Sequence, residues 1–463
     1  MGAFSISGSA FAQNPPAPTP TPTDPAANDP NNPNPTNNPA AAQPTIPPAP
    51  APAATPEPPK PVPDAPKTTF PTMQGPMLRL GELFAIRPGM FLQFWGSMAQ
   101  DTIPRPSGDS GQFAKNFYLR RARFYLLGTI AKNITWFLLW ESANLGQSGG
   151  LNADGTVNKN YSQLAGLGTA FGFNDAWMDF KVNSALSIQA GVFLIPFTRN
   201  ILQSTATYWS LDIAAVSATY IGVTETNVLR DAGVQVKLNA ADGKLEGRAM
   251  VSQGVKLPEK LGGGRLNGKN DPRLTAFLQY NFFEPDAGYV FNGQYFGRKK
   301  IAGVALGGDY QSINGDNPYF ATSATLFAAI PIHGADPKNG GDEFGGQFEY
   351  LHFHGGGVAA GSQVSALGKR DAVLAELGYY NKNAKLSVFG KFEGLFQNGA
   401  ADVTDSQLFG GGLKYFIAEA ICNLTLQYSF ITFPNQSKLE DAMLPRNRHS
   451  ANTLQLQLQL GYF

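Results

Sequence analysis

The end of the chain alternates strictly between apolar and polar side chains. Between positions 452 and 463, polar residues separate four leucines, Leu454, Leu456, Leu458 and Leu460. A period of two puts the leucines on one face of a β-strand and the glutamines on the other. In a barrel strand that crosses a membrane, the apolar face contacts lipid and the polar face lines a wet interior. The stretch therefore predicts a membrane-spanning strand.

The same alternation recurs along the chain from about residue 88. It predicts sixteen strands, at 88–98, 117–131, 134–143, 171–182, 185–194, 228–238, 244–255, 272–283, 299–311, 318–332, 342–354, 369–380, 384–396, 406–418, 421–433 and 451–463. An even number of antiparallel strands puts both ends of a barrel on the same side, which in a bacterial outer membrane is the periplasm. The pattern predicts an all-β fold, a 16-stranded antiparallel transmembrane β-barrel.

Short and long connectors alternate between these strands. Tight turns such as 132–133 and 183–184 alternate along the chain with long polar loops such as 145–170 and 196–227, as in outer-membrane barrels. Two connectors disturb the scheme, because 284–298 is long where a turn is expected and 312–317 is short where a loop is expected. A miscount by two strands in this part of the chain is the alternative interpretation.

The charged residues of a strand share one face. In 171–182, Asp175, Asp179 and Lys181 alternate with apolar residues. A charge that faces lipid near the middle of the bilayer costs ~2–4 kcal/mol for Arg or Lys, so this face is expected to line the lumen. The two aspartates are close enough to neutralise Lys181. By the same parity Arg121 and Arg123 point into the lumen, whereas Arg120 points outward near the rim, within reach of lipopolysaccharide phosphates.

Other luminal cations are expected to pair with acids on their own strand. Arg248 shares its face with Glu246, and Lys391 shares its face with Glu393. Structural ion pairs are therefore the favoured interpretation of these two cations, whereas the adjacent pair Arg121 and Arg123 is the favoured candidate for a role in the pore.

The first 76 residues differ in composition from the rest. They contain 23 of the 35 prolines and almost no large apolar side chains. Such a segment cannot bury enough surface to offset the entropy of ordering it. We expect three parts: a signal-peptide remnant over 1–12, cleaved after Ala12, a disordered Pro/Ala/Asn-rich periplasmic tail over 13–76, and the barrel over 77–463.

Charge and motifs exclude several classes of function. The net charge of +1 does not fit a nucleic-acid-binding protein. No catalytic elbow, zinc-protease motif or phosphate-binding loop occurs, so we expect no enzyme and no cofactor. His352 and His354 share one strand face, but without a third ligand nearby a pair at the loop rim is favoured over a metal site, and no metal is expected.

Several short stretches resemble bacterial porins, in particular the family of phosphate-selective porins. They are 119–124 (LRRARF), 174–179 (NDAWMD), 191–199 (GVFLIPFTR), 229–234 (LRDAGV) and the leucine/glutamine end. The resemblance implies a sixteen-stranded barrel in the outer membrane, usually trimeric, with the third long loop folded inward to narrow the pore. Arg199 and Arg230 flank that loop.

The sequence thus predicts an outer-membrane porin, an ion-transport channel for passive diffusion of small hydrophilic solutes. Rings of Arg or Lys favour anions, so a modest anion preference is expected, with phosphate as a candidate. The pore-lining, anion-attracting candidates are Arg121, Arg123, Lys181, Arg199 and Arg230. Expected partners are small anionic or neutral solutes, outer-membrane lipid, lipopolysaccharide and two further copies in a homotrimer, but no nucleic acid. The alternatives are an outer-membrane barrel enzyme and a soluble β-rich binding protein.

Overall fold

A computed structural model describes most of the chain after residue 76. The described residues are 77–81, 83–100, 113–146, 172–218, 229–254, 271–312, 318–354, 369–397, 405–432, 434 and 450–462. The expected signal remnant over 1–12 and the expected tail over 13–76 lie outside these residues.

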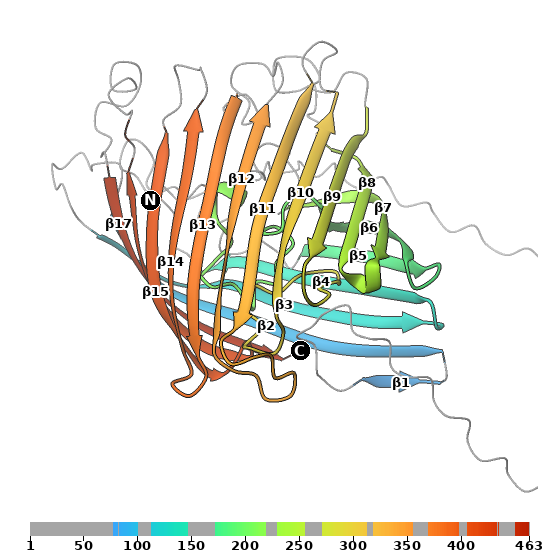
Figure 1. Cartoon of the computed structure of the whole chain (residues 1–463), viewed down its shortest axis with the longest axis horizontal. Helices are drawn as coiled ribbons and strands as arrows, with labels where there is room; N and C mark the ends of the chain where they lie inside the picture. Colours follow the sequence, from blue (N-terminus) through green and yellow to red (C-terminus); the bar gives the residue numbers. More distant parts are fainter. Residues whose placement is uncertain are drawn as a thin grey trace, which may run out of the picture. The chain divides into compact units, whose positions relative to one another are not determined.

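One antiparallel sheet accounts for nearly all regular structure (Figure 1). Its strands are β1 (Leu78–Leu80), β2 (Phe84–Gln100), β3 (Phe113–Ile130), β4 (Ile134–Leu145), β5 (Gly172–Lys181), β6 (Leu186–Leu194), β7 (Arg230–Ala240), β8 (Leu245–Ser252), β9 (Arg273–Asn281), β10 (Ile301–Gln311), β11 (Tyr319–Pro331), β12 (Glu343–His354), β13 (Lys369–Asn381), β14 (Leu386–Gln397), β15 (Ser406–Ala418), β16 (Cys422–Thr432) and β17 (Ser450–Tyr462). A 3-10 turn, η2 (Ala241–Gly243), joins β7 to β8. Among the described residues, no helix has the length and apolar composition to cross a bilayer.

The sheet closes on itself. Each strand from β2 to β17 pairs with its neighbours in sequence, and β17 pairs with β2, with Leu458 opposite Phe94. The three-residue β1 pairs only with the start of β2, so it adds no wall strand. Closure satisfies the backbone groups of every edge, which a sheet in a bilayer requires. The predicted sixteen-stranded antiparallel barrel is confirmed.

Side chains alternate across the wall as the sequence predicts. In β17 the outward Leu456 and Leu458 are 45% and 37% exposed, whereas the inward Gln457 and Gln459 are 1% exposed. In β5, Asp175 and Trp177 face inward and are buried, and Met178 faces outward and is exposed. The wall therefore presents an apolar outer face, as a lipid-contacting barrel does.

A bulge in β3 changes the side to which one arginine reaches. The pairing of β2 with β3 shifts register between Gln93 and Phe94, and Arg120 has no partner in that register. The expected outward direction of Arg120 is wrong, because its guanidinium lies 2.9 Å from a carboxylate oxygen of Asp212 in the β6–β7 connector. A bulge adds one residue to a strand and so breaks the simple parity rule.

The barrel has two rims with different connectors. We call the end where β2 begins and β17 ends the terminal rim. There, β3 to β4 and β13 to β14 are joined by only three or four residues. The two connectors that disturbed the predicted alternation are long and short as the sequence suggested, but the strand count remains sixteen. The β9–β10 connector, 282–300, is long, and much of it is buried against lumen-facing side chains. The β10–β11 connector is short.

Candidate functional site

The connector between β6 and β7 crosses the interior of the barrel, as the resemblance implies. We call its described part, residues 195–218, the inward loop. Its backbone N–H groups donate to lumen-facing side chains of four strands: Asn200 to Glu349 (3.3 Å), Ser210 to Glu376 (3.0 Å), Leu211 to Gln427 (3.0 Å) and Val216 to Glu393 (3.1 Å). Buried backbone donors need partners, and these acceptors supply them. The loop is therefore held against the β12–β16 wall.

Glycines in the wall make room for this loop. A Cβ atom on Gly378 of β13 would lie 2.2 Å from the ring of Trp209, and one on Gly307 of β10 would lie 1.8 Å from the carbonyl oxygen of Phe197. Both distances are far below contact, so no larger residue fits without moving the loop. The Ser323 hydroxyl of β11 also donates to the Phe197 carbonyl (2.7 Å).

The opposite side of the inward loop meets three arginines of β3, which we call the arginine cluster. Arg120 and Arg121 both bind the carboxylate of Asp212 in the loop. Arg123 donates to Glu141 of β4 (2.8 Å) and to the Thr205 hydroxyl of the loop (2.7 Å), and Arg121 lies 3.7 Å from Glu141. The sequence-predicted pair Arg121 and Arg123 is thus brought together at the loop.

The arginine cluster carries more positive than negative charge. Arg120, Arg121 and Arg123 face the two carboxylates of Asp212 and Glu141. Burial alone would raise the pKa of Asp212, but the guanidinium groups of Arg120 and Arg121 hold that pKa well below its usual range. Because three guanidinium groups face two carboxylates, the cluster keeps a surplus of one positive charge.

Arg199, within the inward loop, and Arg230, after it in the chain, are both engaged in side-chain contacts. Arg230, at the start of β7, donates to Asp175 of β5 (3.1 and 3.2 Å). Arg199 is 1% exposed and donates to Gln279 (2.6 Å) and to Asp286 (2.9 Å). Its guanidinium carbon also lies 3.8 Å from the ring centre of Phe327. Arg199 therefore fastens the loop to β9 and to the β9–β10 connector.

Lys181 lies apart from the other candidates, at the terminal rim. It is the last residue of β5 and is exposed. The expected neutralisation of Lys181 by the two aspartates of its strand is wrong. Asp175 pairs with Arg230 (3.1 Å), and Asp179 pairs with Lys237 of β7 (2.7 Å). Both cations reach across the intervening β6 on the inner face of the wall.

The two predicted same-strand ion pairs are confirmed. Arg248 donates to Glu246 (2.6 Å) and Lys391 donates to Glu393 (2.7 Å). Sequence reasoning missed Asp212, Glu349 and Glu376 as loop contacts. The inward parity of the two glutamates was readable, but their partners lie 149 and 166 positions away along the chain.

No metal centre is found in the part of the chain that the structure describes, where no group of three or more His, Cys, Asp or Glu side chains could hold an ion. The Nδ1 atom of His352 lies 2.8 Å from a carboxylate oxygen of Asp371 on the neighbouring strand. This contact supplies an ordinary partner for the histidine.

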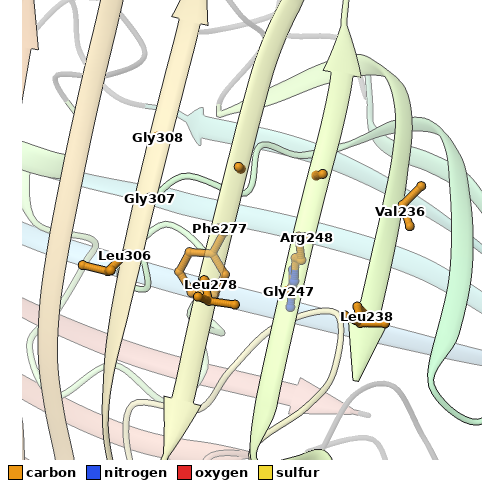
Figure 2. Close-up of a pocket in the computed structure, with 11 residues that line it drawn as sticks. Val236, Leu238, Gly247, Arg248, Phe277, Leu278, Leu306, Gly307 and Gly308 are labelled. Carbon is orange, nitrogen blue, oxygen red and sulfur yellow. The ribbon is translucent and has the colours of Figure 1, made fainter. Parts of the chain in front are cut away.

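A pocket of about 460 Å³ lies on the wall formed by β7 to β10 (Figure 2). Exposed aliphatic side chains surround it, among them Val236, Leu238, Leu278 and Leu306. These residues have the outward parity of their strands, so the pocket belongs to the apolar outer face and not to the pore.

Comparison with known proteins gives a family and a set of distant folds. Residues 101–270 match the family model described as phosphate-selective porin O and P. Three solved structures are similar: the outer membrane channel DcaP of Acinetobacter baumannii (9% identity, 83% of this chain and 99% of that chain covered, TM-score 0.48), OmpF of Salmonella typhi (12%, 83% and 100%, 0.47) and the trimer form of OmpT of Vibrio cholerae (10%, 82% and 99%, 0.46). These values are too low to add to what the fold itself shows. No curated protein matches the chain.

The matched segment contains β3 to β8, the arginine cluster and the inward loop. It lies in a closed barrel with an apolar outer face and a polar inner face, which is the architecture of a channel through an outer membrane. The resemblance to the phosphate-selective porins is confirmed over residues 101–270, and the chain has the barrel fold of an outer-membrane porin.

Proposed function

We propose that this porin lets small hydrophilic solutes diffuse passively across the outer membrane, with a modest preference for anions. The observation that carries the proposal is the surplus positive charge of the arginine cluster, at the place where the inward loop meets β3. Low-dielectric walls strengthen the field of such a cluster inside a narrow passage. A surplus of one charge favours a weak preference over strict selection.

The five candidate residues contribute unequally in this proposal. Arg121 and Arg123 belong to the group with surplus charge, so they act most strongly on a passing ion. Arg199 and Arg230 are paired with Asp286 and Asp175, so their fields are partly cancelled. Lys181 is exposed at the terminal rim and attracts anions at that mouth of the pore.

We also propose how the barrel is oriented in the outer membrane and how its copies assemble. Both barrel ends and the N-terminal segment 13–76 lie on the periplasmic side, and the long loops face outward toward lipopolysaccharide. Three copies form a homotrimer, as the family resemblance implies. In this proposal the channel carries no enzymatic activity.

Planar-bilayer recording tests the function. The purified porin is expected to conduct, and a salt gradient should give a reversal potential of the sign that anion preference requires. Added phosphate should reduce chloride current if phosphate enters the same path. A difference in gel migration between unboiled and boiled samples would verify that the barrel is folded before boiling. A folded protein without conductance, or with a cation-type reversal potential, would contradict the proposal.

A further inference from the structure

The β9–β10 connector enters the barrel from the terminal rim, where turns such as β3–β4 and β13–β14 have only three or four residues. We call its residues 285–297 the insert. Most of the insert is buried, with Tyr289, Phe291, Gln294 and Tyr295 exposed by 2%, 0%, 1% and 5%. A connector left outside the barrel would be solvated, so this burial needs partners within the lumen.

Lumen-facing side chains from opposite parts of the wall hold the insert. On one side, the Tyr289 hydroxyl donates to Asp175 of β5, and Arg248 of β8 donates to the Tyr289 carbonyl (3.1 Å). On the other side, the Glu343 carboxylate of β12 accepts bonds from the N–H groups of Tyr295 (3.0 Å) and Gly297 (2.8 Å). The insert therefore bridges the interior.

The insert also joins the inward loop directly. The Ser204 N–H donates to the Phe291 carbonyl (2.7 Å), and the Phe291 N–H donates to the Leu202 carbonyl (2.8 Å). Gln203 and Phe291 form a parallel bridge. Two segments that enter from opposite rims thus meet by backbone hydrogen bonds inside the barrel.

Aromatic packing closes the far end of the insert. Phe296 contacts Tyr380 of β13 and Phe416 of β15 edge to face, with ring centres 5.3 and 5.2 Å apart. The single charged residue of the insert, Asp286, is paired with Arg199 of the inward loop at 2.9 Å. The insert therefore adds amides and aromatic rings to the interior, without adding an unpaired charge.

We propose that the insert is the second half of the pore constriction and sets the conductance and the size limit of the channel. The inference rests on the proposed diffusion function and extends it. Because the insert and the inward loop are bonded to each other and to the wall, a solute must pass beside both. Because the insert is neutral once Asp286 is paired, it limits size, whereas the arginine cluster sets the sign of the charge preference.

Replacing residues 285–299 with Asn-Gly tests this inference. The β9–β10 ladder continues past the strand ends, since Phe282 N–H donates to the Ala302 carbonyl (2.8 Å) and Glu284 N–H donates to the Lys300 carbonyl (3.2 Å). A two-residue turn of this type closes a hairpin. We expect the single-channel conductance to rise at least about twofold and larger neutral solutes to enter, because pore width governs both. An unchanged conductance in a heat-modifiable, folded variant overturns the inference.

A pair of point variants keeps the test decisive if the shortened chain fails to fold. Ala287 is exposed on the insert, so Ala287→Lys and Ala287→Asp should be tolerated and should shift the reversal potential in opposite directions. Ser184, exposed in the β5–β6 turn, carries the matched controls Ser184→Lys and Ser184→Asp. Shifts at Ala287 no larger than those at Ser184 overturn the inference. If the wild type conducts but the variants give the contrary results above, only the role of the insert is overturned. If the wild type does not conduct, the proposed diffusion function itself is overturned.

Discussion

Removing the positive charge of Arg123 should weaken the anion preference by a calculable amount. Arg123→Gln leaves Arg120 and Arg121 against Asp212 and Glu141, so the surplus charge of the cluster vanishes. The change is mild for the fold, because Glu141 keeps Arg121 at 3.7 Å and also accepts a hydrogen bond from Asn174.

Coulomb's law sets the size of the effect. At about 8 Å in water, one unit charge changes the energy of a monovalent ion by about 0.5 kcal/mol. That energy corresponds to a factor of roughly 2.3 in occupancy. The anion loses this factor and the cation gains it, so the permeability ratio should fall about fivefold at low salt. In 1 M salt the Debye length is about 3 Å, and the difference between variant and wild type should nearly vanish.

Reversal potentials in planar bilayers, measured across salt gradients at low and high ionic strength, check this prediction. Lys132→Gln is the matched control, because it removes the same charge from an exposed residue in the β3–β4 turn. Neutralising Arg121 as well should shift the preference further toward cations. If Arg123→Gln and Lys132→Gln gave equal reversal potentials at low salt, the role assigned to the arginine cluster would be refuted.

Three further predictions concern the wall and the loop. Leu456→Arg, at the middle of β17, should lower the free energy of unfolding in lipid by about 2–4 kcal/mol, and Leu460→Arg, near the strand end, should lower it less. Urea titration read by gel migration measures both values, and equal losses of unfolding free energy would show that Leu456 does not face lipid. Gly378→Val should displace Trp209 and increase proteolysis within the inward loop, whereas Gly308→Val, whose Cβ meets nothing within 4 Å, should not. The folded pKa of Asp212 is depressed, so its stabilising effect is present above its unfolded pKa of about 3.9 and is lost only as pH falls through the lower folded value. Asp212 should therefore add no pH dependence to the conductance between pH 7 and about pH 4.5, so any change in that window should be the same in the wild type and in Asp212→Asn. A change that is lost in Asp212→Asn would contradict the depressed pKa.

The sequence predicted the wall far better than the interior. Strand alternation is a local signal, so the strand count, the inward aspartates of β5 and the outward leucines of β17 followed from period two. Arg120 did not, because a bulge opposite Gln93 adds a residue that no local pattern marks.

The interior depended on contacts between distant parts of the chain. The family resemblance implied an inward loop but not what holds it, since Asn200 meets Glu349 and Ser210 meets Glu376 only in the folded barrel. The long β9–β10 connector was recognised as an anomaly in sequence. Its meaning needed the structure, because burial of Phe291 in the lumen is not a property of residues 284–298 alone.

The pairing of β17 with β2 has a consequence for biogenesis. Across it, the Trp95 indole donates to Gln457 at 2.7 Å, and these residues are 362 positions apart in sequence. Joining such remote partners carries a high entropic cost, so this ladder is expected to form last. Until then both strands offer unsatisfied backbone edges that recruit other chains into aggregates. The thirteen residues of β17 are thus required for closure, because a nascent polypeptide that lacks them forms an open sheet that cannot close into a barrel.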